Sequence, residues 1–326
     1  MCNAGKIYKV SYRLLEKLSS SIMAVRGRRR QQFLRLNGDW EVFCWSVAGL
    51  ETSVVVRKDD LKLAFDMGYA SRPAVSCQHV FISHGHIDHI GGVPSHVRKR
   101  LMSHAKPSTY YMPEHLVQTT KQSLEIAAVQ SETAELATHA YLKPVGPGES
   151  IQLPAAYVAV PFPTVHAVTS QGYIIYKQHK KLKEEFQGME SQEIASLKKQ
   201  GVEVVDEELV PEIAFTGDTT FEIFEKLAHP DLLKVKVLIL EATYIDKDID
   251  KQGKTSRTKA RERGHVHLQE LIDNADLFKD VGSIYLMHFS DKYSSGYIWR
   301  TVKKVSLPAP LKGKLYVGNM VHDLGF

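Results

Sequence analysis

The sequence predicts an α/β protein in which short strands bring a functional site together at their carboxyl ends. Apolar runs rich in β-branched residues, typical of buried strands, recur along the chain and alternate with helical segments. Four of these runs end in a residue that can bind a metal or transfer a proton: His84, Asp218, Glu241 and His288. Because open sheets place their sites at the carboxyl ends of strands, this recurrence predicts one shared site.

The composition is that of a globular protein with a large core. The chain has 326 residues, 43% hydrophobic and 24% charged, and no linker or repeat divides it. We therefore expect one domain, residues 37–326, after a basic extension, residues 1–36. No apolar run approaches the roughly 18 residues that span a bilayer, so we expect no membrane partner. Three cysteines without paired spacing argue against a disulfide framework and a thiolate zinc cluster, which fits a reducing intracellular compartment.

The extension at residues 1–36 accounts for the positive charge of the chain. Residues 1–39 carry nine Lys and Arg residues against two acids, a net charge of +7, whereas the whole chain carries +5, which leaves −2 on the rest. The extension is nearly free of acids and has a rough helical stripe of apolar residues, as organelle transit peptides do. Three alternatives remain: a tail that attracts nucleic acid, a nuclear import signal at residues 26–30, and a dispensable extension that precedes a second translation start at Met23.

Three short strands are predicted next, at residues 40–47, 52–56 and 61–65. Asp66 follows the third strand. It either caps a turn or supports the neighbouring loop by hydrogen bonding, and the sequence leaves both interpretations open.

A buried strand at residues 80–82 then stops at four potential metal ligands within six residues: His84, His86, Asp88 and His89. Imidazole nitrogens and a carboxylate are donors that suit zinc and suit calcium or magnesium poorly. The alternative, a polar loop with histidines placed by chance, is disfavoured by this density of ligands. We predict a metal site here.

The middle of the chain predicts helices at residues 94–103 and 113–140, followed by strands at 151–153, 157–162 and 172–176. His166 lies on the turn between the last two strands. We expect His104, His115 and His139 to be solvated or structural. Residues 177–199 alternate lysines with glutamates, which predicts either a solvated helical hairpin or an arm with a basic root.

The loop at residues 251–263 carries six positive charges and one negative charge and runs directly into His265. Charge runs are usually solvated surface. Because this loop lies between Glu241 and His265 and the chain after residue 39 is slightly acidic, we expect Lys254, Arg257 and Lys259 to bind phosphate groups.

Together these motifs resemble the metallo-β-lactamase superfamily and, within it, the short-form tRNase Z family. The likeness rests on His84 to His89, with His166, Asp218 and His288, and on four more specific segments: residues 215–219, 241–243, 264–267 and 288–293. The resemblance implies an α/β (α+β) fold, an αββα sandwich of two mixed sheets with outer helices. It also implies a hydrolase, a zinc-dependent endoribonuclease that removes the 3′ trailer of precursor tRNA and leaves a 3′-hydroxyl on the tRNA.

The resemblance also implies roles for individual residues. His84, His86 and His166 would hold one Zn²⁺ and Asp88, His89 and His288 a second, with Asp218 bridging the two ions of each subunit. Hydroxide held by the metals would attack the phosphodiester, with Asp88 accepting a proton. Glu241 would orient His265 as general acid, with His267 as a possible substitute. Ser290, Lys292 and Thr219 would contact phosphate.

The family likeness further implies a homodimer in which the arm at about residues 177–211 of one subunit holds tRNA for the other. Leu240 and Lys292 depart from the family pattern, and Lys292 loses the bidentate phosphate contact of an arginine. The alternative functions are a small-molecule phosphodiesterase or a lactone or thioester hydrolase of the same superfamily, and a binding protein without catalysis. We expect an intracellular protein of the cytoplasm, with the mitochondrion, plastid or nucleus as alternatives.

Overall fold

Two seven-stranded β-sheets form the centre of the computed structural model, which describes residues 33–318. The first sheet joins seven strands in chain order: β1 (Leu34–Arg35), β2 (Glu41–Val47), β3 (Glu51–Lys58), β4 (Leu61–Phe65), β5 (His79–Phe81), β6 (Ser108–Met112) and β7 (Ala140–Pro144). The second joins β8 (Ile151–Leu153), β9 (Tyr157–Pro163), β10 (Gln171–Leu182), β11 (Val205–Phe215), β12 (Val237–Glu241), β13 (Ser283–Met287) and β14 (Leu315–Val317).

Each sheet is antiparallel in its first half and parallel in its second. Strands β1 to β4 and β8 to β11 pair antiparallel, whereas β4 to β7 and β11 to β14 pair parallel. Short turns suffice for antiparallel neighbours, and the longer connections between parallel strands leave room for helices. The parallel halves bring several carboxyl strand ends to one edge of each sheet.

The two sheets pack face to face through large aromatic residues. Phe65 stacks on Phe215 with ring centroids 4.8 Å apart, and the centroids of Phe81 and Tyr173 lie 5.0 Å apart. All four rings are fully buried, which makes this interface the main apolar core between the layers.

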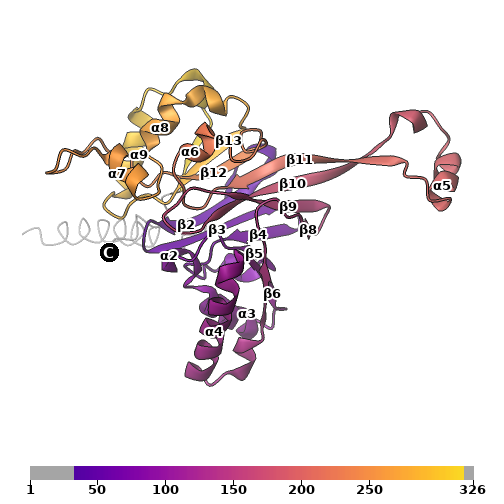
Figure 1. The fold of residues 1–326 in the computed structure, drawn as a ribbon, viewed down its shortest axis with the longest axis horizontal. Coiled ribbons are helices and arrows are strands. Elements are labelled where there is room, and N and C mark those ends of the chain that lie inside the picture. The colour runs from indigo at the N-terminus through magenta and orange to yellow at the C-terminus, as the bar shows by residue number, and fades with distance from the viewer. Residues whose placement is uncertain (1–32, 319–326) are drawn as a thin grey trace, which may run out of the picture. The chain divides into compact units, whose positions relative to one another are not determined.

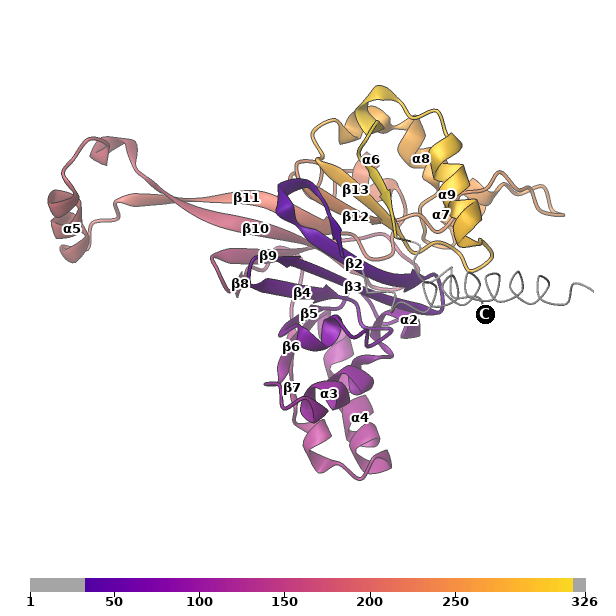
Figure 2. The ribbon, with the colours of Figure 1, turned by 180° about the vertical axis from the view of Figure 1, so that it is seen from behind.

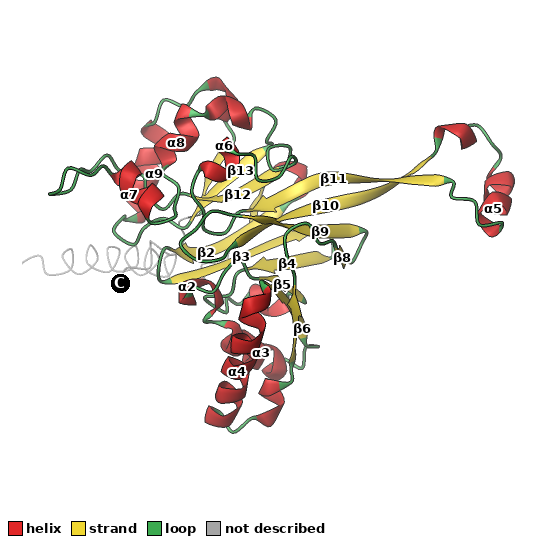
Figure 3. Cartoon of the chain, in the orientation of Figure 1, coloured by secondary structure: helices red, strands yellow, loops and turns green. Residues whose placement is uncertain are grey.

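Helices cover the outer faces of the sandwich. The α-helices of the described residues are α2 (Ile87–Ile90), α3 (Val93–Met102), α4 (Glu114–Gln130), α5 (Ser191–Lys199), α6 (Glu222–Glu225), α7 (Ser256–Glu262), α8 (Leu268–Asp273) and α9 (Ser295–Lys304). Helix α5 lies away from the sandwich (Figure 1). Helices α3 and α4 lie on the side of the first sheet, and α6, α8 and α9 lie on the side of the second (Figures 1 and 3). The predicted α/β sandwich is therefore confirmed. Among residues 33–318, none of the helices combines the length and apolar character needed to cross a membrane.

Strands β10 and β11 continue beyond the sheet as a two-stranded arm that carries α5 at its tip, which Figure 2 shows from behind. Residues 178–182 of β10 pair only with β11. Lys180 and Lys181 face Glu207 and Asp206 across the pair, and Lys180 forms an ion pair with Glu207 at 3.3 Å. The basic root predicted from residues 177–199 is therefore neutralised by the returning strand, and residues 177–211 carry a net charge of −2.

The long helix predicted for residues 113–140 is wrong in its second half. Helix α4 ends at Gln130, and Glu132 has a φ of 49°, in the left-handed region that stops a helix. Residues 140–144 form β7 instead, because they pair with β6 at the edge of the first sheet. The predicted extension, residues 1–36, lies outside the described residues except for its last four.

Candidate metal centre

The histidine-rich loop after β5 supplies four of the candidate ligands. His84 and His86 lie in an irregular segment that follows the buried strand, and α2 then places Asp88 and His89 in a single helical turn. Gly68 packs against this turn. A Cβ atom at residue 68 would lie 1.7 Å from the carbonyl oxygen of Asp88, so only glycine fits there.

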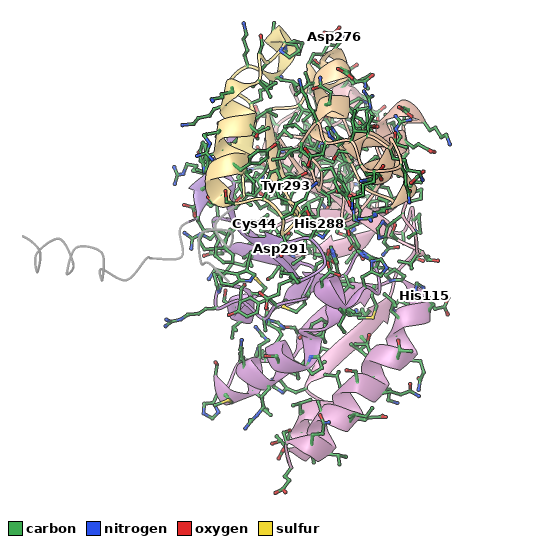
Figure 4. The ribbon with its side chains drawn as sticks, turned by 90° about the vertical axis from the view of Figure 1, so that its left-hand side faces the viewer. Cys44, His115, Asp276, His288, Asp291 and Tyr293 are labelled. Carbon is green, nitrogen blue, oxygen red and sulfur yellow. The ribbon has the colours of Figure 1, made fainter. Side chains whose placement is uncertain are left out.

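The second sheet supplies the other three candidates. His166 lies in the connection from β9 to β10, Asp218 follows β11 and His288 follows β13. Strands β9, β11 and β13 run in the same direction, so their carboxyl ends share one edge. Figure 4 shows His288 where the two halves of the ribbon meet. All seven predicted ligands are thus brought together from two sheets.

The ligand atoms form two adjoining groups. In one, the ligand atoms of His84, His86, His166 and Asp218 all lie within 4.8 Å of one another, and in the other those of Asp88, His89 and His288 do so. Asp218 joins the groups, since its Oδ2 lies 3.3 Å from His89 Nε2 and 3.9 Å from His84 Nε2. His89 Nε2 lies 3.2 Å from His288 Nε2. Asp218 therefore occupies the position between two possible cations.

Hydrogen bonds on the far side of the rings fix how four histidines face the centre. Their Nδ1 atoms donate to protein acceptors: His84 to Ser83 Oγ at 2.9 Å, His89 to Asp66 Oδ2 at 2.7 Å, His166 to the Gly264 carbonyl at 2.8 Å and His288 to Thr243 Oγ1 at 3.0 Å. Both hydroxyls accept, because Ser83 donates its own proton to Asp66 and Thr243 donates its proton to Glu241. Each histidine is left with its Nε2 lone pair toward the centre.

Asp66 thus supports the loop and does not merely cap a turn. Its Oδ1 accepts from the backbone nitrogen of Ser83 at 2.7 Å, and its Oδ2 accepts from Ser83 Oγ and His89. Asp66 has a φ of 55° and His288 a φ of 58°, so both strand ends adopt the left-handed region that is rare for residues with a side chain. Such conformations persist where surrounding contacts hold them, as they do here.

Two buried polar atoms of this cluster have no hydrogen-bond partner within the described residues: His84 Nε2 and Asp218 Oδ1. Leaving such atoms unpaired in a protein interior is costly, and a bound cation would satisfy both. Nitrogen and carboxylate oxygen donors suit zinc or a similar borderline divalent ion. The residues therefore fit a metal centre.

The electrostatics of the cluster also favour a cation. Burial and the neighbouring His89 imidazole lower the pKa of His84 to about 2, so His84 is a neutral ligand. Burial alone would raise the pKa of Asp218, but the imidazoles of His288 and His89 outweigh it and hold that pKa well below its ordinary value. Burial would likewise raise the pKa of Asp88, and hydrogen bonds from His288 and His89 lower it instead. Both carboxylates are therefore ionised.

A second group of interacting residues, Glu241 and His265, lies directly beside the candidate ligands. His265 Nδ1 lies 2.9 Å from Glu241 Oε1, and the His265 ring centroid lies 5.2 Å from that of His166. Glu241 is fully buried and also accepts from the backbone nitrogens of Thr219 at 2.9 Å and Thr243 at 3.2 Å. Although burial lowers the pKa of His265, the Glu241 carboxylate outweighs it and raises that pKa to about 9. His265 therefore holds a proton at neutral pH.

Gly264 makes this placement possible. Its φ is 79°, and a Cβ atom at residue 264 would lie 2.6 Å from His166 Nδ1. Its carbonyl accepts from that same nitrogen. A single glycine thus positions both a ligand candidate and the histidine that follows it.

His267 lies apart from the cluster. Its Nε2 donates to the Asp246 carbonyl at 2.7 Å, and its Nδ1 accepts from the Gln269 backbone nitrogen at 3.0 Å. It lines a cavity of about 460 Å³ that none of the seven ligand candidates lines. Both ring nitrogens are occupied, so the geometry favours His265 over His267 for proton transfer.

The predicted phosphate contacts differ in accessibility. Ser290 is half-buried next to β2, and Lys292 Nζ forms an ion pair with Asp246 Oδ2 at 2.5 Å while its side chain remains 43% exposed. Thr219 is fully buried, and its Oγ1 accepts from the Val165 nitrogen at 3.1 Å. The expectation of a phosphate contact for Thr219 is therefore wrong, because its role is to hold Glu241 and the neighbouring loop.

The predicted basic loop is partly helical and largely neutralised. Residues 256–262 form α7, capped by Thr255. Each predicted cation is paired with a carboxylate: Lys254 with Glu262 at 2.7 Å, Arg257 with Asp273 at 2.6 Å and Lys259 with Asp250 at 3.0 Å. The count of charges over residues 251–263 did not reveal these pairs, because two of the acids, Asp250 and Asp273, lie outside that range.

Sequence reasoning also missed several supporting residues. The backbone nitrogen of Gly49 donates to Asp88 Oδ2 at 2.9 Å, and Ser83 and Thr243 orient ligand histidines. Ser83 directly precedes His84, and Thr243 lies two residues after Glu241. These positions within the motifs could have indicated that both hydroxyls support the site. Nothing in the sequence distinguishes Gly49.

Comparisons with known proteins agree with this geometry. The family described as the beta-lactamase superfamily domain matches residues 67–289. The chain is 35% identical over 271 residues to tRNase Z TRZ1 of Arabidopsis thaliana, covering 83% of this chain and 92% of that protein. It is 37% identical over 260 residues to the chloroplastic tRNase Z TRZ2 of the same plant, covering 80% and 70%. Among solved structures, the metallo-beta-lactamase fold protein YhfI of Bacillus subtilis matches with a TM-score of 0.55 at 15% identity, covering 86% of this chain and 97% of that one.

Proposed function

Because this chain belongs to the tRNase Z family of the beta-lactamase superfamily, we propose that it is an endoribonuclease that removes the 3′ trailer from precursor tRNA. The observation that carries this proposal is the Glu241–His265 pair beside seven candidate metal ligands. Cleavage that leaves a 3′-hydroxyl on the tRNA requires a proton for the departing ribose oxygen. A small ester with a good leaving group needs no such donor.

The proposed cofactor is zinc, two ions per subunit. His84, His86 and His166 would hold one ion, Asp88, His89 and His288 the other, and Asp218 would bridge them. This assignment is supported by the two unpaired buried atoms, His84 Nε2 and Asp218 Oδ1, and by the orientation of the Nε2 lone pairs. When bound, such ions supply Lewis-acid stabilisation of the phosphodiester charge and a water of lowered pKa.

Two groups of the protein move the protons. Asp88 accepts a proton from the attacking water, and the Gly49 nitrogen on its Oδ2 keeps the carboxylate oriented. His265 donates a proton to the leaving ribose 3′-oxygen from Nε2, because Nδ1 is held by Glu241. With its pKa raised to about 9, His265 begins the reaction protonated.

The substrate contacts we propose are Ser290 and Lys292 near the scissile phosphate, with Lys254, Arg257 and Lys259 farther along the RNA. Lys292 is the best placed of the cations, since its ammonium also lies 5.6 Å from the centroid of the Tyr244 ring, whose own centroid lies 6.4 Å from that of His265. Lys292 and the three loop cations would all have to exchange a carboxylate for a phosphate, so the contribution of each is smaller than its charge suggests.

We further propose a homodimer. Strand β10 begins at Gln171, five residues after His166, and runs away from the site toward the arm (Figure 1). The arm therefore leads away from the metal centre of its own subunit, and in a symmetric dimer it would serve the partner's site.

The expected location is the cytoplasm. Import into plastids or mitochondria through residues 1–36 is the alternative, and a fluorescent fusion of that segment distinguishes them.

The decisive experiment is incubation of purified protein with a 5′-labelled precursor tRNA carrying a 3′ trailer, with and without chelator. His265→Ala and Asp88→Ala are run alongside. We expect a chelator-sensitive cut after the discriminator base that is lost in both variants. An intact precursor, under conditions where metal is bound and a small phosphodiester is hydrolysed, would overturn the proposed substrate but not the fold.

A further inference from the structure

Helix α9 presents a basic and aromatic face next to the metal centre. Its buried side consists of Ser295, Ile298 and Val302, which pack it against the second sheet. The rest of the helix surface, which we call the α9 face, exposes five large side chains: Tyr297, Trp299, Arg300, Lys303 and Lys304. The helix begins seven residues after His288, so this face is connected to the site by a short segment.

The cations of the α9 face differ from those of the loop at residues 251–263. Within residues 33–318, Arg300, Lys303 and Lys304 form no ion pair with a carboxylate, whereas Lys254, Arg257 and Lys259 each form at least one. Unpaired surface cations are available to bind phosphates without first releasing a carboxylate. Helix α9 therefore carries three cations without a carboxylate partner, where charge counting along the sequence did not place a binding surface.

The two aromatic residues on this face are partly exposed. Tyr297 is 37% exposed and Trp299 is 43% exposed. The Lys303 ammonium lies 4.6 Å from the centroid of the Trp299 ring. Exposed rings interleaved with cations are the arrangement by which proteins bind single-stranded nucleic acid, since bases stack on the rings while phosphates pair with the cations.

A continuous series of contacts joins the face to the site. The Tyr297 ring stacks on that of Tyr293, with centroids 5.3 Å apart and planes 10° apart. Lys292 Nζ lies 5.0 Å from the Tyr293 ring centroid and 5.6 Å from that of Tyr244, which is next to His265. RNA that leaves the centre along this line passes from Lys292 to the α9 face.

We propose that the α9 face binds single-stranded RNA of the 3′ trailer, downstream of the scissile phosphate. The inference rests on the proposed tRNA-processing function and adds where the trailer is held. The trailer is favoured over the acceptor stem because stacking on Tyr297 and Trp299 requires unpaired bases, and the bases of a duplex are already stacked and paired.

The test compares precursor tRNAs that carry trailers of one nucleotide and of about fifteen nucleotides. Two variants are used: Trp299→Ala, and the triple variant Arg300→Gln, Lys303→Gln, Lys304→Gln. We expect KM for the long trailer to rise about tenfold in each, with KM for the one-nucleotide trailer unchanged. The salt dependence of long-trailer binding should flatten by about 2 in logarithmic slope for the triple variant. A control variant, Lys106→Gln, Lys121→Gln, Lys143→Gln, removes equal charge from exposed positions on the side of the first sheet and should change neither value.

Binding of a fluorescent single-stranded oligoribonucleotide in chelator gives a second readout that is independent of cleavage. Loss of this binding in both α9 variants supports the proposal even if the wild type fails to cut tRNA, which would overturn only the proposed function. An equal rise in KM for both trailers would assign the face to the tRNA body and overturn the proposal. Unchanged RNA binding together with a changed mass in solution would overturn it in favour of a protein interface.

Discussion

Asp66 Oδ2 lies 2.7 Å from His89 Nδ1, so a carboxylate at the end of one strand holds a candidate ligand histidine that follows another strand. Burial alone would lower the pKa of His89, but the carboxylates of Asp218 and Asp66 outweigh it and raise that pKa well above its ordinary value. The carboxylates that stabilise a proton on His89 would also stabilise a metal cation bound at its Nε2 in place of that proton. Several measurable consequences follow from this contact and from the others around it.

Replacing Asp66 with asparagine should weaken metal binding by about 10- to 100-fold, because the amide cannot orient and polarise His89 as the carboxylate does. The measurement is competition against a chromophoric chelator. Asp276→Asn, on the exposed surface, is the matched control. Thermal denaturation of the metal-free proteins separates a binding defect from unfolding, and unchanged affinity in a folded Asp66→Asn protein would contradict the role assigned to Asp66.

Removing the proton donor should affect RNA far more than an activated substrate. His265→Ala should lower kcat on precursor tRNA by about 10²- to 10⁴-fold, since the ribose oxygen leaves poorly without a proton. Hydrolysis of a nitrophenyl phosphodiester should fall little, because nitrophenolate needs no proton to leave. If both rates fell by the same factor, His265 would have a structural or metal-binding role.

The dependence of kcat on pH should report the Glu241–His265 pair. The pKa of His265 is raised to about 9, so the protonated donor persists through neutral pH and is lost as the pH rises through 9. Any stability that the pair contributes is present below pH 6.5 and is likewise lost through pH 9. In Glu241→Gln, burial is no longer opposed by this carboxylate, so the decline in kcat should move to lower pH. An unchanged pH profile in that variant would exclude Glu241 as the group that sets the His265 pKa.

The role of the loop cations can be tested by neutralising the cations and, separately, by removing the carboxylates that pair with them. Neutralising Lys254, Arg257 and Lys259 should raise KM for tRNA and flatten its salt dependence, while a small phosphodiester is spared. Removing their partners instead, with Asp250→Asn, Glu262→Gln and Asp273→Asn, should tighten tRNA binding because the cations become free. Equal loss on both substrates in the first variant would refute contact between this loop and RNA.

Asp246 should stabilise the segment that leads from β12 to α7. Burial alone would raise its pKa, but hydrogen bonds from Lys292 and Tyr293 outweigh it and lower that pKa to about 2. Asp246→Asn should reduce the free energy of unfolding by about 1–2 kcal/mol at pH 7. Because the pKa is depressed, this difference is present above about pH 4 and disappears as the pH falls through 2. Urea denaturation across this range measures it, with exposed Asp280→Asn as control, and a difference that persists at pH 2 would contradict the assignment.

Much of the fold was predictable because its signals are local. The strands at residues 61–65 and 151–153 were predicted with the observed bounds, since apolar and β-branched runs between turns leave few alternatives. The end of α4 and the existence of β7 were not, because Ala140–Pro144 becomes a strand only by pairing with β6. Whether two segments pair as strands cannot be read from the residues of either segment alone.

The sequence by itself determined which chemical groups the site contains. The dense cluster from His84 to His89, and the strand-end positions of Asp218, Glu241 and His288, are readable because parallel strands deliver their carboxyl ends to one edge. Only the tertiary structure decided how those groups are used. It turned each Nε2 inward through Asp66, Ser83 and Thr243, and it placed His265 and not His267 on Glu241. It also neutralised the loop cations while leaving those of α9 unpaired within the described residues. Hydrogen bonds and ion pairs depend on distances between segments remote in the chain, and a linear pattern of residue types does not contain those distances.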